Sequence, residues 1–280
     1  MIRPGLPKLV ATDLDGTLVR SDDTVSAFTH EVLARVRAAG IRIVCCTGRG
    51  PRLTELVRRD VPEAEFLVMA GGGRVVDLTE PAYPVVLRDE RLDGDVLADL
   101  LAKLEREVGP LSVMVEAGDA PNSVLWGDPD PMWRYPDVVE ARIRAEALEG
   151  PVIKGFARHA AHDADSLLAV ARRLVPPSVA TLTQAGLGYV EICPPGVDKA
   201  SGLALVATVL GVDPDDVLVF GDMPNDLSMF DWAGFGRVAV ANAHRDVRSV
   251  ADDVTLSNDA DGVAVYLDAL LGVDSGRDAA

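Results

Sequence analysis

The sequence has no long hydrophobic run, although 48% of its residues are hydrophobic. Its apolar stretches are interrupted by polar or small residues well before the roughly 18 residues needed to cross a bilayer. The first dozen residues also lack the apolar stretch of a signal peptide. We therefore expect a soluble protein without a membrane partner.

Cysteine is scarce, with Cys45, Cys46 and Cys193 as the three examples. An odd count does not fit a disulfide framework, and two adjacent cysteines in an apolar run are typical of small buried side chains. A reducing cytoplasm is therefore the expected location.

Basic residues are also few compared with acidic residues. The chain has 27 Lys and Arg residues against 44 Asp and Glu residues, a formal net charge of -17. This balance argues against binding to nucleic acid or to an anionic membrane surface, because such a binding face must gather cations. An anionic ligand would have to be attracted by local charge, from a metal or from a few basic residues.

What the sequence does contain is a regular alternation of apolar strands and amphipathic helices. Strands are predicted at residues 9–12, 41–46 and 66–70, with Ser26 as the expected cap of the first helix and Pro51 at the start of the second. This alternation is typical of a parallel sheet with crossover helices. We predict an α/β protein with a Rossmann-like, doubly wound parallel sheet as its core.

The alternation changes at about residue 83. Residues 83–194 mix helices and strands in another order, including a helix predicted at 167–175 with Asp165 as its candidate cap. We predict a core of residues 1–82 and 195–280, interrupted by an inserted α+β domain over 83–194.

Beyond the insert, the core pattern returns. A helix is predicted at 199–210, ended by Gly211, and a very apolar strand at 217–220 follows it. Parallel sheets bind ligands at the carboxyl ends of their strands, so the residues that follow these strands are candidate site residues.

Polar side chains suited to phosphate and metal follow these strand ends or begin the helices after them. They are Asp13 with Asp15, Thr47 with Gly48, Lys199, and Asp222 with Asn225 and Asp226. We expect Asp13 and Asp222 to face each other, where two like charges at about 4 Å repel by roughly 4 kcal/mol at an effective dielectric near 20. A divalent cation removes that repulsion, and oxygen ligands favour Mg²⁺.

This arrangement suits phosphoryl transfer. With a cation in place, Asp13 can act as a nucleophile towards a phosphoryl group whose oxygens are held by Lys199 and Thr47. Asp15 is placed to protonate the leaving alcohol and then to activate the water that breaks the aspartyl phosphate.

Together, these motifs resemble the haloacid dehalogenase-like phosphohydrolase superfamily. The motifs are Asp13-Leu-Asp15-Gly-Thr17, Thr47-Gly48-Arg49, Lys199, and Gly221-Asp222-x-x-Asn225-Asp226. The long insert between the second and third motifs looks like the type IIB cap of the Cof-like branch. The resemblance covers nearly the whole chain.

The resemblance implies a role for each of these residues. Asp13 is the implied nucleophile and Asp15 the general acid/base. The metal would take the carboxylates of Asp13 and Asp222 and the backbone carbonyl of Asp15. Phosphate would be held by Thr47, the Gly48 backbone and Lys199, while Asn225 and Asp226 line or orient the metal site. One departure is Gly71-Gly72-Gly73, where many Cof-like relatives have Asn-Gly.

Three functions are compatible with these features. The first is a Mg²⁺-dependent phosphatase of small phosphorylated metabolites such as sugar phosphates. The second is a phosphomutase that returns the same aspartyl phosphate to a hexose. The third is a phosphate-binding protein without turnover. Neither the substrate nor the oligomeric state can be read from the sequence.

Several side chains also have simpler interpretations. Lys199 can be a surface lysine, Thr47 a helix cap, and Asp226 a carboxylate that favours a helix start. His159 and His162 imitate a metal pair beside Asp163 but have no third ligand at helical spacing. Three aromatic residues of the insert can line a substrate face or fill a small core, namely Trp126, Trp133 and Tyr135.

Overall fold

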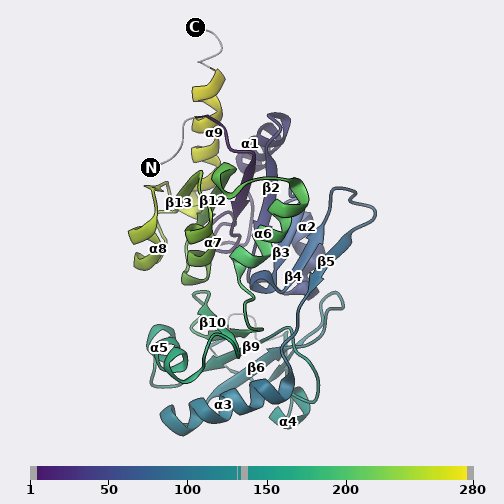
Figure 1. The fold of residues 1–280 in the computed structure, drawn as a ribbon, viewed down its shortest axis with the longest axis vertical. Helices are drawn as coiled ribbons and strands as arrows, with labels where there is room; N and C mark the ends of the chain where they lie inside the picture. The colour runs from purple at the N-terminus through teal and green to yellow at the C-terminus, as the bar shows by residue number, and fades with distance from the viewer. Residues whose placement is uncertain (1–4, 131, 134–137, 276–280) are drawn as a thin grey trace.

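The computed structural model describes residues 5–130, 132–133 and 138–275, and these residues form two β-sheets (Figure 1). The first sheet has eight strands in the order β14-β13-β12-β1-β2-β3-β4-β5. Its strands are β1 (Leu9–Thr12), β2 (Arg42–Cys46), β3 (Phe66–Met69), β4 (Arg74–Asp77), β5 (Val85–Asp89), β12 (Val217–Gly221), β13 (Gly236–Ala239) and β14 (Asp253–Val254).

Six neighbouring strands of this sheet, from β14 to β3, are parallel, and β4 and β5 add an antiparallel edge. The central strands β1, β2, β3 and β12 are buried almost throughout, as expected for a parallel sheet covered by helices. The predicted α/β fold class, with a parallel sheet as its core, is confirmed.

Capping residues account for ends of two of the helices in this first unit. They are α1 (Ala27–Ala38), α2 (Thr54–Asp60), α6 (Lys199–Leu210), α7 (Leu227–Trp232), α8 (Arg245–Val250) and α9 (Gly262–Ser275). The side chain of Ser26 caps α1 by accepting from the backbone N–H of Thr29 at 3.0 Å. Gly211 ends α6 in the left-handed conformation, with φ of 65°.

The second sheet has six strands in the order β10-β11-β9-β6-β7-β8 and carries its own hydrophobic core. Its strands are β6 (Ser112–Glu116), β7 (Leu125–Gly127), β8 (Val139–Ala141), β9 (Lys154–Arg158), β10 (Thr181–Gln184) and β11 (Val190–Cys193). The accompanying helices are α3 (Gly94–Val108), α4 (Arg144–Ala147) and α5 (Ala164–Leu174). This unit is the lower part of the molecule in Figure 1.

Two details differ from the prediction. Helix α5 starts at Ala164 and is capped by Asp163, which accepts from the backbone N–H of Ser166 at 2.8 Å, so Asp165 is not the cap. Strand β5 pairs with β4 in the first sheet, whereas the boundary at residue 83 placed it in the insert. The sheet pairing of the core thus continues to residue 89.

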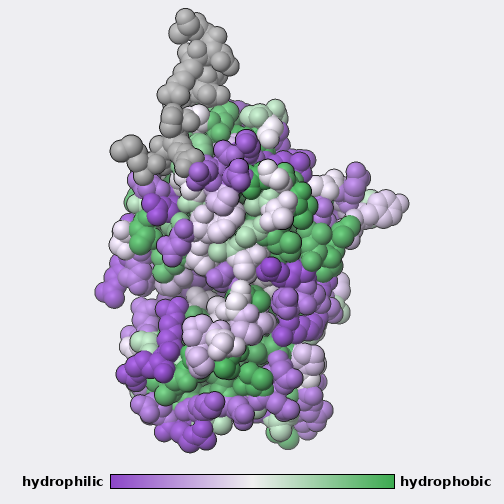
Figure 2. Space-filling model, in the orientation of Figure 1, coloured by the Kyte–Doolittle hydropathy of each residue, from purple (hydrophilic) through white to green (hydrophobic). Residues whose placement is uncertain are grey.

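β5 is also the outer strand of its sheet, and Figure 2 shows apolar surface beside it. Tyr83, Val85 and Val86 are all exposed there. None of the helices in the described ranges is both long and apolar enough to span a bilayer.

The first two of the three glycines after β3, Gly71 and Gly72, have different surroundings. Gly71 and Gly72 both have positive φ, of 64° and 111°. A Cβ on Gly72 would lie 2.0 Å from the carbonyl oxygen of Asp198, the residue before Lys199. A Cβ on Gly71 would have Cys193 Sγ, at 4.0 Å, as its nearest neighbour. Gly72 is therefore required by close packing, and Gly71 by conformation alone.

We expect Gly72→Ala to be more destabilising than Gly71→Ala. Gly71→Ala should lower the free energy of unfolding by about 1 kcal/mol, the cost of placing an L-residue in the left-handed region. Gly72→Ala should lower it by about 1 to 3 kcal/mol more, because the methyl group must displace backbone. Urea unfolding of the two variants measures the difference, and equal midpoints would contradict this packing.

Candidate active site

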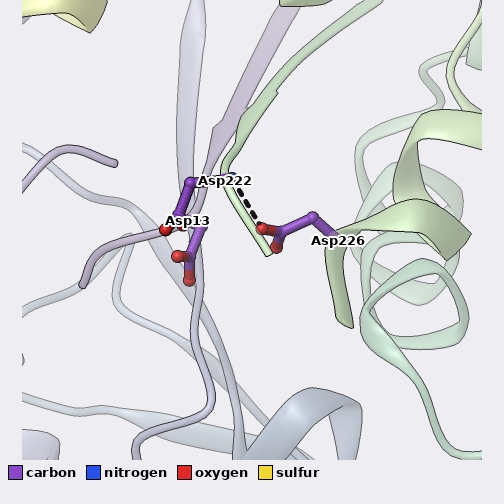
Figure 3. A group of neighbouring side chains, drawn as sticks. All are labelled: Asp13, Asp222 and Asp226. Carbon is purple, nitrogen blue, oxygen red and sulfur yellow. Dashed lines mark hydrogen bonds between the residues drawn. The ribbon is translucent and has the colours of Figure 1, made fainter. Parts of the chain in front are cut away.

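The sheet brings the first and last acidic motifs together. β1 and β12 are parallel neighbours, with Thr12 opposite Phe220, and the N–H of Asp13 donates to the Phe220 carbonyl at 3.0 Å. Asp13 and Asp222 follow these two strands directly. Their side chains therefore leave the same sheet edge from adjacent positions, and Figure 3 shows them next to each other.

Lys199 joins this acidic cluster from the start of α6. Its side chain is fully buried, and Nζ lies 2.6 Å from Asp13 Oδ1 and 2.5 Å from Asp226 Oδ1. The interpretation of Lys199 as a surface lysine is therefore wrong. One ammonium faces three carboxylates, which leaves an excess of negative charge in a buried site.

Asp226 differs from the other two acids because one of its oxygens accepts from two backbone N–H groups. Oδ1 accepts from Lys199, and Oδ2 accepts from the backbone N–H of Met223 at 3.0 Å. Oδ2 also accepts from the backbone N–H of Asp222 at 2.9 Å, the bond drawn in Figure 3. Asp226 thus holds the loop after β12 and fixes the position of Lys199.

The turn after Asp15 reaches back to the cluster through Thr17. Its Oγ1 donates to Asp222 Oδ1 at 2.8 Å and lies 3.5 Å from Asp13 Oδ2. Gly16, with φ of 83°, makes this turn possible, since a Cβ there would lie 2.5 Å from Asp222 Oδ2. Thr17 was part of the recognised motif, but no role had been predicted for it.

Burial shapes the protonation of the cluster. Burial raises the pKa of Asp13 well above its usual value, with Lys199 opposing the shift and Asp226 and Asp222 adding to it. Burial and then the charge of Asp226 raise the pKa of Asp222 to about 6. Burial lowers the pKa of Lys199, but the charges of Asp13 and Asp226 outweigh it, so that pKa is raised overall.

These properties fit a cation site. Oxygen atoms of Asp13, Asp222 and Asp226 lie within 4.8 Å of one another, the one such acidic, Cys or His group found in the described part of the chain. Asn225 Oδ1, next to them in sequence, is buried and has no hydrogen-bond partner among the described residues. Carboxylates with excess negative charge and an unsatisfied amide oxygen are a donor set that can bind a hard divalent cation. His159 and His162 are not part of it.

Asp15 lies apart from the cluster. Its side chain is 45% exposed and pairs with Arg49, whose Nε and Nη2 lie 2.9 and 2.7 Å from the carboxylate oxygens. Arg49 is held in turn by Asp60, at 3.1 Å from Nη1. The guanidinium therefore fixes where Asp15 points, a contact that the sequence analysis had not predicted.

Thr47 and Gly48 follow β2 at the same sheet edge. Thr47 Oγ1 accepts from the backbone N–H of Arg49 at 3.0 Å. The helix that follows begins at Pro51 with Gly50 as its N-cap and without a side-chain cap bond, so the interpretation of Thr47 as a helix cap is wrong. A hydroxyl that accepts a hydrogen bond can still donate its own hydrogen. The Gly48 carbonyl accepts from Lys154 Nζ at 2.7 Å. Because Lys154 lies on β9, the second unit is bonded directly to this loop.

A cavity of about 330 Å³ lies between the two units. Asp13, Asp15 and Asn225 line it from the first unit, and Lys154, Glu191 and Glu116 line it from the second. Lys154 is fully buried and bonded to Glu191 at 2.5 Å. These three residues of the second unit were missed because their approach to the core depends on tertiary packing, which has no local sequence signal.

The structure also separates the aromatic residues of the insert. Trp133 packs edge to face against Phe156 and Tyr189, which confirms the small-core role. It also lines the cavity, and its contact with a substrate stays a prediction. Trp126 instead stacks with Arg142, whose guanidinium lies 3.9 Å from the ring centroid. Tyr135 lies outside the described residues.

Two known phosphatases are similar to this chain over most of its length. A phosphatase of 5-amino-6-(5-phospho-D-ribitylamino)uracil from Bacillus subtilis (strain 168) is 28% identical over 299 residues, covering 94% of this chain and 98% of that protein. A phosphoglycolate phosphatase from Natronomonas pharaonis is 31% identical over 264 residues, covering 92% and 96% of the two chains.

The fold and the family model lead to the same classification. A solved subclass IIB sugar phosphatase of the haloacid dehalogenase superfamily has a similar fold, with a TM-score of 0.76 at 21% identity over 93% of this chain and 98% of that one. The predicted superfamily is confirmed by the family model, and the type IIB branch stays a prediction. A family model described as haloacid dehalogenase-like hydrolase matches residues 10–267. The chain therefore belongs to the haloacid dehalogenase-like hydrolases and is a hydrolase of that family.

Proposed function

We propose that this protein is a Mg²⁺-dependent phosphatase that hydrolyses small phosphorylated metabolites through an aspartyl phosphate on Asp13. The observation that carries the proposal is the buried pairing of Asp13 with Lys199 and Asp222 at the end of β1 and β12. The names of the two relatives, both phosphatases, support it. All three cysteines are buried and free, which is compatible with the expected cytoplasmic location.

The carboxylates of Asp13 and Asp222 and the backbone carbonyl of Asp15 would hold the cation. Asn225 and Asp226 would support this site, Asp226 by fixing Lys199 and the loop after β12. Bound there, Mg²⁺ would neutralise the excess negative charge and polarise the phosphoryl oxygens.

In the first chemical step, Asp13 is the nucleophile. Lys199 fixes Oδ1 of this side chain, and Thr17 lies near Oδ2, so the carboxylate is held in one orientation. One of its oxygens attacks phosphorus, the bond from phosphorus to the alcohol oxygen breaks, and Asp13 becomes phosphorylated. Lys199, the Thr47 hydroxyl and the Gly48 backbone hold the phosphoryl oxygens.

Asp15 acts first as the general acid and then as the general base. It protonates the alcohol oxygen as that bond breaks, and its carboxylate then takes a proton from the water that attacks the aspartyl phosphate. Inorganic phosphate leaves and Asp13 is regenerated. Because Arg49 binds Asp15 in this structure, the acid step requires that their ion pair opens.

We further propose that the inserted unit acts as a cap. It lines the cavity opposite Asp13, and Lys154 bonds it to the Gly48 carbonyl. Closure of such a cap excludes bulk water from the aspartyl phosphate and strengthens the electrostatic contacts inside.

Asp13→Asn should lower the turnover of p-nitrophenyl phosphate by at least about 10³-fold, because the amide is a poor nucleophile. The assay is phenolate release with saturating Mg²⁺. Glu80→Gln, on an exposed loop of the same unit, is the matched control and should keep full activity. Undiminished turnover in a folded Asp13→Asn protein would rule out this nucleophile.

Asp222→Asn should have opposite effects on the protein with and without metal. Without Mg²⁺, the variant should be more stable, because one carboxylate of the crowded cluster is gone. With Mg²⁺ at about 100 times its dissociation constant, the free energy of unfolding of the unaltered protein should rise by about 2.7 kcal/mol. The free energy of unfolding of the variant should rise much less.

Thermal unfolding with and without Mg²⁺ measures both effects, and titration calorimetry gives the dissociation constants. Glu80→Gln should behave like the unaltered protein. A Mg²⁺-induced shift of equal size in Asp222→Asn would exclude Asp222 as a metal ligand.

A further inference from the structure

The loop after β2 has three consecutive carbonyl groups, each of which accepts a hydrogen bond. The carbonyls of Thr47 and Arg49 accept from backbone N–H groups of residues 70–71 in the same unit, at 3.0 and 2.8 Å. The carbonyl between them, on Gly48, accepts from Lys154 Nζ at 2.7 Å. The inserted unit therefore makes the middle one of the three bonds that hold this loop.

The Lys154 bond acts on a peptide group that the first unit holds from its other side. The Gly48 carbonyl and the Arg49 N–H belong to this one planar group. Lys154 donates to the carbonyl, and Thr47 Oγ1 accepts from the N–H at 3.0 Å. Because C=O and N–H point in opposite directions from a trans peptide, the two bonds together fix its orientation.

The N–H of Gly48 itself has no partner within the described part of the chain. Gly48 lines the cavity, and its N–H donates to no acceptor among those residues. A Cβ on Gly48 would lie 3.8 Å from Lys154 Nζ and 3.9 Å from Asn225 Nδ2, so this residue also lies beside the candidate cation site. A backbone N–H in such a place suits a phosphoryl oxygen. Its direction depends on how the neighbouring peptide is held.

Lys154 is itself held firmly by the second sheet. It is the first residue of β9, which pairs with β6 on one side and with β11 on the other. Its ammonium is buried and donates to Glu191 on β11 at 2.5 Å. Burial lowers the pKa of Lys154, but the charge of Glu191 outweighs it, so that pKa is raised overall. The Gly48 carbonyl therefore receives a charged donor, which makes a stronger bond than a neutral one.

We propose that Lys154 is a positioning residue for the hydrolysis of phosphate monoesters. Its bond to the Gly48 carbonyl holds the loop in the conformation in which the Gly48 N–H meets the phosphoryl group. Lys154 makes no contact with the alcohol part of the substrate, so its effect is the same whatever that alcohol is. This inference rests on the proposed phosphatase function and adds to it a residue of the inserted unit.

Lys154→Met removes the ammonium and keeps the length of the side chain. It should lower kcat/KM for p-nitrophenyl phosphate about 10-fold or more, as expected for the loss of a hydrogen bond from a charged group. Lys103→Met, an exposed change on α3 of the same unit, is the matched control and should keep the full value. An unchanged kcat/KM in Lys154→Met would overturn the assignment.

Inorganic phosphate tests where Lys154 acts, because it has no alcohol part. Its competitive inhibition constant, measured with Mg²⁺ present, should rise in Lys154→Met by about the same factor as kcat/KM falls. The stabilisation of the protein by phosphate in thermal unfolding should fall in parallel, without any turnover. A lowered kcat/KM with an unchanged phosphate constant would mean that Lys154 contacts the alcohol, and would overturn the assignment.

A double-mutant cycle tests whether Lys154 acts through the peptide group. Thr47→Val removes the other bond to the same group. If both bonds hold one peptide, the double variant should have a phosphate constant within about 3-fold of that of the more affected single variant. Independent effects would multiply instead, and a constant equal to the full product would contradict the proposal.

A second variant separates this role from the stability of the inserted unit. Lys154→Met leaves Glu191 buried without its partner, whereas Lys154→Met/Glu191→Met replaces the whole ion pair by apolar side chains of similar volume, which is often neutral for stability. The double variant should keep the urea midpoint of the unaltered protein and still bind phosphate more weakly. Normal phosphate binding by this folded variant would overturn the proposal.

The two proposals fail in different ways. If the unaltered protein neither binds phosphate nor hydrolyses p-nitrophenyl phosphate, the phosphatase proposal fails and this inference fails with it. If the unaltered protein does both and Lys154→Met matches it, this inference alone is overturned.

Discussion

The site depends on keeping two carboxylates buried next to each other. At about 4 Å, such charges repel by roughly 4 kcal/mol at an effective dielectric near 20. Asp13 and Asp222 cannot move apart, because the pairing of β1 with β12 fixes the backbone that carries them. Lys199 compensates for part of this charge, and Asp226 is occupied in holding Lys199. The fold therefore imposes the remaining negative charge, and a bound cation would neutralise it.

This part of the molecule could be predicted from the sequence because it is built from regular elements. Asp13 and Asp222 follow buried apolar strands, and Lys199 begins a helix that ends at Gly211, as expected. Once the strands are known to be parallel, their carboxyl ends must meet at one edge. The order of neighbouring strands then brings distant residues together without any further information.

The local sequence does not determine other features, such as the cap of α5, the sheet to which β5 belongs and two ion pairs. Asp163 and Asp165 are both chemically suitable caps for α5, and only the backbone geometry selects Asp163. β5 looks like the start of a new unit until its hydrogen bonds to β4 are seen. The pairs Asp15–Arg49 and Glu116–Arg52 join segments that are far apart in sequence. They follow from tertiary packing, for which a single sequence offers no periodic signal.

The second unit contacts the loop after β2 in two places. Lys154 bonds the carbonyl of Gly48, the residue whose backbone is proposed to hold phosphate, and Glu116 packs against Gly50 beside Arg52. Any side chain at position 50 would push Glu116 away, so Gly50 sets how closely the units approach. The loop proposed to hold phosphate is therefore in direct contact with the inserted unit through Lys154 and Glu116.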